Sequence, residues 1–160
     1  MNMKRSSWKV YGLWILFVEA VGALSGWLSR GGMELYQTGI VKPPLSPPGI
    51  VFPIVWTILY ALMGVGAARV WLTPASRDRT RALRVFFLQL AVNFLWSIIF
   101  FNLRAFGLAL VWLVGLWMLV VWMMETFAEV DLWAARLQFP YFLWVTFAAY
   151  LNFGVWRLNG

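Results

Sequence analysis

Residues 41–72 read VKPPLSPPGIVFPIVWTILYALMGVGAARVWL, a cluster of prolines that leads directly into a long apolar run. Within that run, residues 49–72, Arg69 is the only charged residue. A helix of about 20 apolar residues is long enough to cross the ~30 Å hydrocarbon core of a bilayer. The stretch therefore predicts a transmembrane helix that begins just after the prolines.

Four other segments have the same length and character, and short polar or basic connections separate them. The five predicted helices cover residues 8–29, 49–72, 82–102, 106–125 and 133–157. We therefore expect an all-α membrane protein, a bundle of five transmembrane helices that forms a single domain over residues 1–160. The longest connection, residues 30–48, is expected to be a loop that covers one end of the bundle as a lid.

The composition supports a membrane protein and excludes several kinds of site. The chain is 62% hydrophobic and 12% charged, whereas a soluble domain is about one-quarter charged. It has no cysteine and no histidine, so we expect no disulfide, no metal site and no bound cofactor. The net charge of +7 comes from basic residues between apolar runs, which indicates membrane topology and argues against a nucleic-acid partner.

The basic residues also predict how the chain sits in the membrane, because cytoplasmic connections carry an excess of lysine and arginine. With the N-terminus inside, the cytoplasmic side would hold Lys4, Arg5, Lys9, Arg69, Arg77, Arg79, Arg81, Arg84 and Arg136. The other side would hold Arg30, Lys42, Arg104 and Arg157. We expect a bacterial cell membrane, with the N-terminus cytoplasmic and the C-terminus and the lid outside.

Two carboxamides lie in the middle of the third predicted helix. Gln89, Asn93 and Ser97 follow one another at intervals of four residues, so they share one face. Inside a membrane such groups need partners. They either bond neighbouring helices and do nothing more, or they form the polar floor of a ligand cavity.

Aromatic side chains share faces on two other predicted helices. Phe52, Trp56 and Tyr60 lie on one face of the second helix, and Trp144 and Ala148 lie on one face of the fifth. Trp56 and Trp144 would lie too deep for the interfacial belt that tryptophans usually form. They either pack as an aromatic core or wall a cavity for a flat, mostly apolar ligand.

Glu19 is the one carboxylate predicted well inside a span. An acidic residue in a membrane is a candidate for function, although it could also be neutral and hydrogen-bonded. Pro140, near the start of the fifth predicted helix, removes one backbone hydrogen bond and is expected to bend that helix. The prolines of residues 43–48 should stiffen the lid, and Pro53 falls in the opening turns of its helix, where little hydrogen bonding is lost.

Three stretches together resemble the translocator protein family, also called the TspO/MBR or tryptophan-rich sensory protein family, to which the peripheral benzodiazepine receptor is related. The first is Lys42-Pro43, Ser46-Pro47-Pro48 and Phe52-Pro53-x-x-Trp56-x-x-x-Tyr60. The second is QLAVNFLWSIIFF at residues 89–101, and the third is PYFLWVTFAAYLNFGVWRLN at residues 140–159.

The resemblance implies five transmembrane helices, usually in a homodimer, around a cavity that the first loop caps. It implies binding of porphyrins such as protoporphyrin IX, and of ligands of the benzodiazepine-site type. Carried over to this sequence, the pocket should include Pro47, Phe52, Trp56, Asn93, Trp144 and Ala148. Helical spacing adds Tyr60 and Gln89 to these ligand-binding candidates.

This chain departs from the family pattern at two positions of the lid and in one motif. Many members carry tryptophan where Leu35 and Leu45 stand here. The absence of these two tryptophans weakens any light-driven reaction of a bound porphyrin that would be assigned to the lid. Sterol remains a possible partner, but its motif is imperfect, because six residues separate Tyr150 from Arg157.

We therefore expect a membrane receptor or carrier for porphyrins and benzodiazepine-site ligands, with a sensory, regulatory or transport role. One alternative is light- and oxygen-dependent degradation of porphyrin through Trp56 and Trp144. Another is a structural membrane subunit without a ligand. No acid–base or nucleophile–base pair is visible in the sequence, so we assign no catalytic residue.

Overall fold

The protein is described here by a computed structural model that covers residues 3–160, with side chains from Ser7 onward. Within these residues the chain forms helices and short connections and contains no strand. The long helices are α1 (Met3–Leu28), α3 (Val51–Trp71), α4 (Arg77–Ser97), α5 (Phe106–Val130) and α7 (Phe139–Asn159). The short ones are α2 (Arg30–Gly39), the π-helical turn η1 (Ile98–Asn102) and α6 (Leu132–Arg136).

Four of these helical segments are long and apolar enough to cross a membrane: Ser7–Leu28, Val51–Trp71, Arg77–Asn102 and Phe106–Val130. The predicted all-α chain is thus confirmed, together with four candidate spans. α7 has 21 residues, as many as α3, but it carries Tyr141, Thr146 and Asn152, which make it less apolar. The fifth span remains a prediction.

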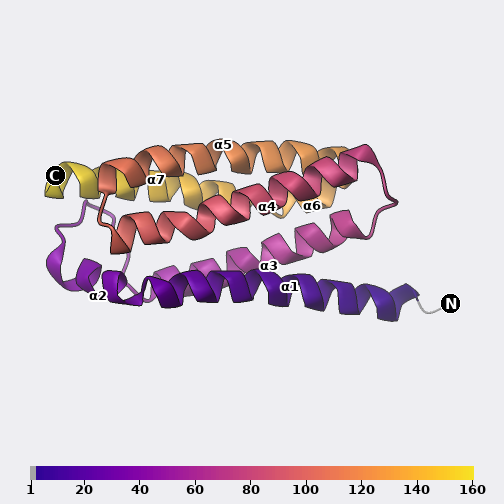
Figure 1. Cartoon of the computed structure of the whole chain (residues 1–160), viewed down its shortest axis with the longest axis horizontal. Coiled ribbons are helices and arrows are strands. Elements are labelled where there is room, and N and C mark those ends of the chain that lie inside the picture. Colours follow the sequence, from indigo (N-terminus) through magenta and orange to yellow (C-terminus); the bar gives the residue numbers. More distant parts are fainter. Residues whose placement is uncertain (1–2) are drawn as a thin grey trace.

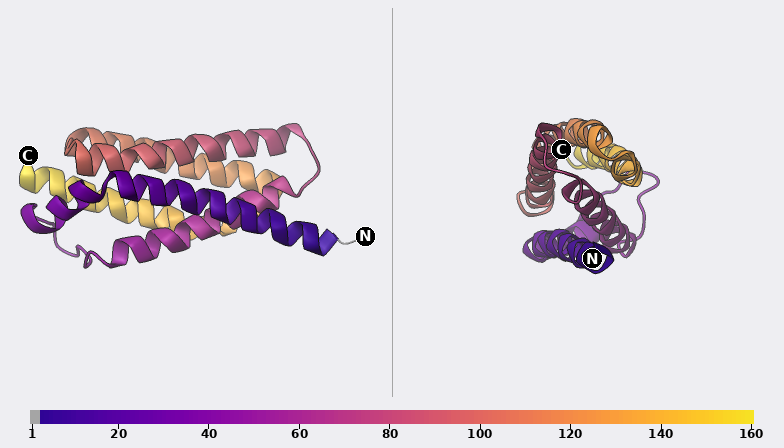
Figure 2. Two further views of the ribbon diagram at one scale, coloured as in Figure 1. Left: turned by 60° about the horizontal axis from the view of Figure 1, so that its bottom comes forward. Right: turned by 90° about the vertical axis from the view of Figure 1, so that its right-hand side faces the viewer.

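The long helices run side by side along one axis, with the N-terminus and the C-terminus at opposite ends (Figure 1). α1 packs on α3, α4 packs on α5, and α5 packs on α7. Seen end-on, α1 lies at the edge of the bundle opposite α5 (Figure 2). The short helix α2 lies across the same end of the bundle as the C-terminus (Figure 1).

The first connection is more ordered than the sequence suggested. Residues 30–39 form the helix α2, so the expectation of a loop was wrong for this part, and only residues 40–50 are irregular. α2 is held by Tyr36, which is 6% exposed and packs its ring against the rings of Phe52 and Phe101. This helix depends on contacts with the rest of the bundle, which local sequence patterns do not reveal.

The fifth predicted helix, residues 133–157, is divided in two. α6 ends at Arg136 and α7 begins at Phe139, so Pro140 lies in the first turn of α7 and not at a bend. A proline in a first turn removes an N–H that has no partner within the helix. The Gln138 amide fixes the break by donating to the Leu62 carbonyl of α3 at 3.0 Å and to the Ala134 carbonyl at 3.3 Å.

Two helices extend beyond their predicted ends into polar sequence. α4 begins at Arg77, where the Ser76 hydroxyl accepts a hydrogen bond from the Arg79 N–H at 3.1 Å. α5 continues to Val130. The side chains of Lys4 and Arg5, on which the orientation prediction also rests, lie outside the described residues.

Candidate ligand cavity

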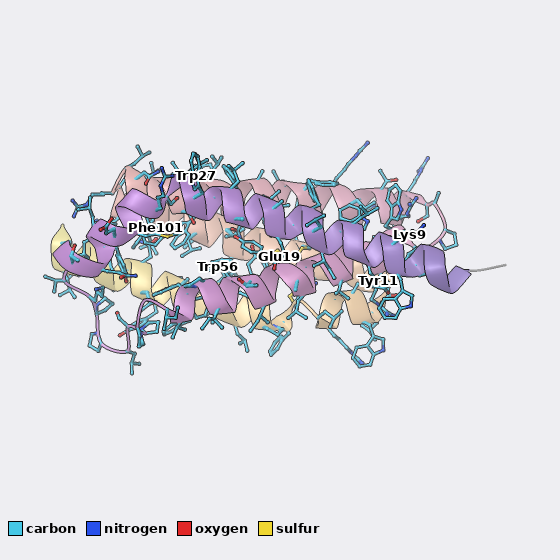
Figure 3. All side chains as sticks on the ribbon, turned by 90° about the horizontal axis from the view of Figure 1, so that it is seen from below. Lys9, Tyr11, Glu19, Trp27, Trp56 and Phe101 are labelled. Carbon is cyan, nitrogen blue, oxygen red and sulfur yellow. The ribbon has the colours of Figure 1, made fainter. Side chains whose placement is uncertain are left out.

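A cavity of about 510 Å³ lies beneath α2, between α1, α3, α7 and the end of α4 with η1. This volume is in the range of small-molecule sites. Its aromatic lining comprises Tyr36, Phe52, Trp56, Tyr60, Trp96, Phe100, Phe101 and Trp144. Figure 3 shows Trp56 and Glu19 between α1 and α3. Aromatic rings from α2, α3, α4, η1 and α7 therefore contribute to the cavity wall.

The two aromatic faces predicted on separate helices meet at this cavity. On α3, the ring of Trp56 stacks on the ring of Tyr60 with centroids 5.4 Å apart and 27° between their planes. Trp144 of α7 approaches Trp56 edge-on, with centroids 6.4 Å apart, and Phe52 with centroids 5.8 Å apart. Ala148, one turn further along α7, also lines the cavity.

Gln89 and Asn93 lie one layer behind the cavity wall and do not line it. The Tyr60 hydroxyl donates to Asn93 Oδ1 at 3.0 Å, and Asn93 Nδ2 donates to the Tyr141 hydroxyl at 2.7 Å. That hydroxyl in turn donates to Gln89 Oε1 at 2.9 Å. Gln89 is 0% exposed and Asn93 is 2% exposed. The two amides join α3, α4 and α7 and reach the cavity through Tyr60, so direct contact with a ligand stays a prediction.

Tyr141 is a residue whose role the sequence reasoning missed. It is fully buried and connects both carboxamides of α4. Tyr141 lies three residues before Trp144 and seven before Ala148, so the three residues share one face of α7. This spacing is the feature of the sequence that could have indicated its role. A buried tyrosine hydroxyl that both accepts and donates a hydrogen bond holds its partners in fixed positions.

A second polar contact fixes the wall where α4 meets α7. Trp96 Nε1 donates to Asn152 Oδ1 at 3.1 Å, and Asn152 Nδ2 donates to the Phe106 carbonyl at 2.9 Å. The Trp96 ring stacks on Phe100, with centroids 5.2 Å apart. These buried tryptophan and asparagine groups are thus paired, as buried polar groups require.

The roof of the cavity is formed by α2 and by the irregular residues 40–50 that follow it, to which the name lid is restricted from this point. Burial raises the pKa of the Tyr36 hydroxyl above its ordinary value, so this hydroxyl stays neutral. Beside the main cavity, a smaller pocket is lined by Pro47 and Lys42, and it shares Tyr36 and Phe52 with the cavity. Pro47 therefore lies in this adjoining pocket, while the main cavity is bounded by other residues.

The lid, residues 40–50, is fastened to the last turns of α7. The Val41 N–H donates to Asn159 Oδ1 at 3.0 Å, and Asn159 Nδ2 donates back to the Val41 carbonyl at 2.8 Å. The Tyr150 hydroxyl donates to the Pro44 carbonyl at 2.8 Å. These contacts hold the proline-rich segment against the bundle, so the cavity is covered at this end by a fixed structure.

The charges of the cavity are few. Glu19 is the only charged side chain among the described residues that line it. In the part of the chain that the structure describes, no group of three His, Cys, Asp or Glu residues could hold a metal ion. The cavity offers ring faces and a small number of polar groups, which suits the binding of a flat, mostly apolar molecule.

Comparison with known proteins agrees with the motifs of the sequence. The sequence profile of the TspO/MBR family matches residues 14–157. The tryptophan-rich protein TspO of Chlorobaculum tepidum is 39% identical over 141 residues, 88% of this chain and 89% of that protein. The tryptophan-rich sensory protein of Cereibacter sphaeroides is 36% identical over 149 residues, 91% and 92% of the two chains. The translocator protein of Sus scrofa is 36% identical over 146 residues, which are 87% of this chain and 86% of that protein.

Proposed function

The chain belongs to the TspO/MBR family, and from that premise we propose that it is a membrane receptor or carrier whose cavity binds porphyrins. Protoporphyrin IX is the leading candidate, and flat ligands of the benzodiazepine-site type would use the same walls. The observation that carries the proposal is the cavity of about 510 Å³ bounded by Phe52, Trp56 and Trp144. Such rings favour a flat conjugated ligand, which can stack on the face of one ring and meet another edge-on.

Lys42 is the cation that we assign to the carboxylates of such a ligand. Its ammonium lies 5.1 Å from the centroid of the Tyr36 ring, at the pocket that adjoins the cavity. Arg30, the other basic residue near the lid, donates to the Trp27 carbonyl at 2.7 Å and lies over the Trp27 ring. Trp27 is 58% exposed, so Arg30 is directed to the outer surface and Lys42 is better placed.

The six site residues Pro47, Phe52, Trp56, Tyr60, Trp144 and Ala148 would contact the ligand, with Pro47 at its lid end. Asn93 and Gln89 would act through Tyr60, because they lie behind it. This division follows from the positions described above. It predicts that changes at Trp56 or Trp144 affect affinity more directly than changes at Gln89.

In the membrane, we take α7 as the fifth transmembrane helix of a single domain, because it has 21 residues and packs along α5. Four apolar helices fit an integral, multi-pass membrane protein. With five spans the termini lie on opposite sides, and the excess of basic residues puts the N-terminus in the cytoplasm of a bacterial cell. A homodimer is the expected assembly, as the family resemblance implies.

A thermal-shift titration with protoporphyrin IX tests the proposed binding. A ligand that binds only the folded state raises the free energy of unfolding by ~2.7 kcal/mol at one hundred times its dissociation constant. We expect a rise in the unfolding temperature that saturates with protoporphyrin IX. No shift with protoporphyrin IX or with benzodiazepine-site compounds would favour the alternative of a structural subunit without a ligand.

A second candidate function is degradation of bound porphyrin in light and oxygen. It is favoured by one contact, since the Trp56 and Trp144 rings meet at the cavity with centroids 6.4 Å apart, where both would adjoin a bound ring. Illumination of the porphyrin complex with and without oxygen separates the two functions. Loss of the porphyrin spectrum only in oxygen would support degradation, and an unchanged spectrum would leave binding alone.

A further inference from the structure

Glu19 marks the end of the cavity that lies farthest from the lid. Glu19, Gly22, Ala23 and Gly26 follow the spacing of one face of α1, and all four line the cavity. Since α1 runs toward α2, Glu19 is the deepest of them. A side-chain carbon at Gly22 would collide with the ring of Tyr60. Tyr60, the deepest of the cavity-lining aromatic residues of α3, therefore lies against α1 one turn from Glu19.

Within the part of the chain whose side chains the structure describes, the Glu19 carboxylate has no ion-pair partner. Among the described residues, the ion pairs join Arg69 to Asp131 and Arg81 to Glu129, and neither pair includes Glu19. The rest of the cavity lining is uncharged. Removing a carboxylate from water without a counter-charge is unfavourable. The Glu19 carboxylate would therefore stabilise the binding of a ligand that brings a positive charge to this position.

The two ends of the site therefore carry opposite charges. Lys42 lies in the pocket under the lid, and Glu19 lies at the opposite end of the main cavity. Between them stand the faces of Trp56 and Tyr60, which attract cations as well as flat rings. A ligand with a carboxylate edge is favoured when that edge faces Lys42 and disfavoured when it faces Glu19.

We propose that Glu19 makes the cavity selective for flat aromatic ligands that carry a positively charged nitrogen, which it binds at the deep end. The same carboxylate repels the carboxylate edge of a tetrapyrrole and so fixes that edge toward the lid. The inference rests on the proposed function, because it assumes that the cavity holds the ligand. An N–H⁺ to carboxylate contact in partly dehydrated surroundings is among the stronger hydrogen bonds.

Three probes that share one ring system test this selectivity on the purified full-length protein. They are protoporphyrin IX, its neutral dimethyl ester, and its diamide with a protonated primary amine on each arm. Dissociation constants are measured from the Soret absorbance in an uncharged detergent for the parent and for Glu19→Gln. Glu125→Gln is the matched control, because Glu125 is exposed on α5 and does not line the cavity.

Glu19→Gln should weaken binding of the cationic probe about tenfold, which corresponds to ~1.4 kcal/mol. It should strengthen binding of protoporphyrin IX and leave the neutral ester unchanged, and Glu125→Gln should change none of the three. Ala23→Lys provides a second variant that keeps Glu19 in place. A lysine four residues along α1 can neutralise the carboxylate, so it too should remove the preference for the cationic probe.

The outcomes separate this inference from the function on which it rests. If none of the three probes binds the parent protein, the proposed porphyrin site is wrong. If the probes bind but both variants keep the parent's ratio of affinities for cationic and anionic probes, the role of Glu19 is wrong and the site stands. An equal change for all three probes would also overturn charge selectivity, since it would reflect altered packing.

Discussion

Tyr60 is the residue that connects the cavity to the interior of the bundle. Its ring stacks on Trp56 at the cavity wall, and its hydroxyl donates to Asn93 in the buried polar chain. A ligand that moves Trp56 would thus act on Tyr60, and Tyr60 on the hydrogen bonds that join α3, α4 and α7. At this scale, the proposed recognition of a ligand and the stability of the bundle would depend on the same side chain.

Tyr60→Phe should lower the stability of the protein by about 1–3 kcal/mol, because Asn93 Oδ1 would be left buried without its donor. Tyr150→Phe is the control, since the Tyr150 hydroxyl donates to the Pro44 carbonyl at an exposed position and its loss should cost less. The free energy of unfolding in mixed micelles measures both. A Tyr60→Phe protein as stable as the control would contradict the role of the buried chain.

The cavity faces of Phe52, Trp56 and Tyr60 could be predicted from the sequence because helical spacing alone places them together. The partners of Asn93 could not. Which side chain of α7 meets an amide of α4 depends on how far one helix is shifted along the other, and a single sequence does not contain that register. Tyr141 was missed for this reason.

At the scale of elements, the lid is secured by the close approach of its backbone to α7. Gly154 of α7 faces the ring of Pro43, and a side-chain carbon at Gly154 would collide with that ring. Asn159 and Tyr150 bond the lid on either side of this contact along α7. The lid therefore needs a glycine at this position of the helix.

Gly154→Ala should destabilise the lid, while the same change at Gly115 of α5 should stabilise the protein. No atom of the described residues lies within 4 Å of a side-chain carbon added at Gly115. Alanine there should therefore stabilise α5 by ~1 kcal/mol, the difference in helix propensity between alanine and glycine. Unfolding temperatures of the two variants measure the difference. Equal gains would show that the lid does not rest on Gly154, and faster release of porphyrin from Gly154→Ala would support its role as a cover.

Asp131 joins three elements at the opposite end of the bundle. It accepts hydrogen bonds from Arg69 of α3 at 3.1 Å and from the Ala134 N–H of α6 at 3.0 Å. Burial by itself would raise the pKa of the Asp131 carboxyl, but these hydrogen bonds and the Arg69 charge outweigh it and hold the pKa below its ordinary value. A carboxyl whose pKa is lowered by folding stabilises the folded state only while it is ionised.

Asp131→Asn should therefore lower the free energy of unfolding by about 1 kcal/mol at neutral pH. The value is modest because the side chains of Asp131 and Arg69 are both partly exposed. The contribution is present above the ordinary pKa of about 4 and is lost as the pH falls through the lower folded value. The difference from the parent should accordingly shrink in acid. Glu129→Gln, whose partner Arg81 is exposed at 3.8 Å, should change little, and a pH-independent loss for Asp131→Asn would contradict the ion pair.

Four of the five predicted spans are found as candidate spans, and they were predictable at this scale because hydropathy and length decide them. α2 and the break between α6 and α7 were not, because both depend on tertiary contacts. α2 is held by the packing of Tyr36 on rings of α3 and η1. The break is held by the bond from Gln138 to the Leu62 carbonyl.

For the whole molecule, the distribution of basic residues predicts the orientation in the membrane. The chain contains no cysteine, so single cysteines can report which side of the membrane a segment faces. In intact bacteria, a membrane-impermeant maleimide should label Thr38→Cys on α2. Ala75→Cys, between α3 and α4, should react only after lysis, and the reverse pattern would mean that the N-terminus is outside.

The central claim for the whole molecule is that the cavity between α3 and α7 binds porphyrin. The most direct test is a titration of the purified protein with protoporphyrin IX, followed by Soret absorbance, for the parent, Trp56→Ala and Trp122→Ala. Trp122 is 46% exposed on α5 and does not line the cavity. Loss of the Trp56 stacking face should weaken binding about three- to tenfold, in line with ~0.5–1.5 kcal/mol for an aromatic contact, and Trp122→Ala should bind like the parent. Equal affinities for all three proteins, or a loss confined to Trp122→Ala, would contradict the claim.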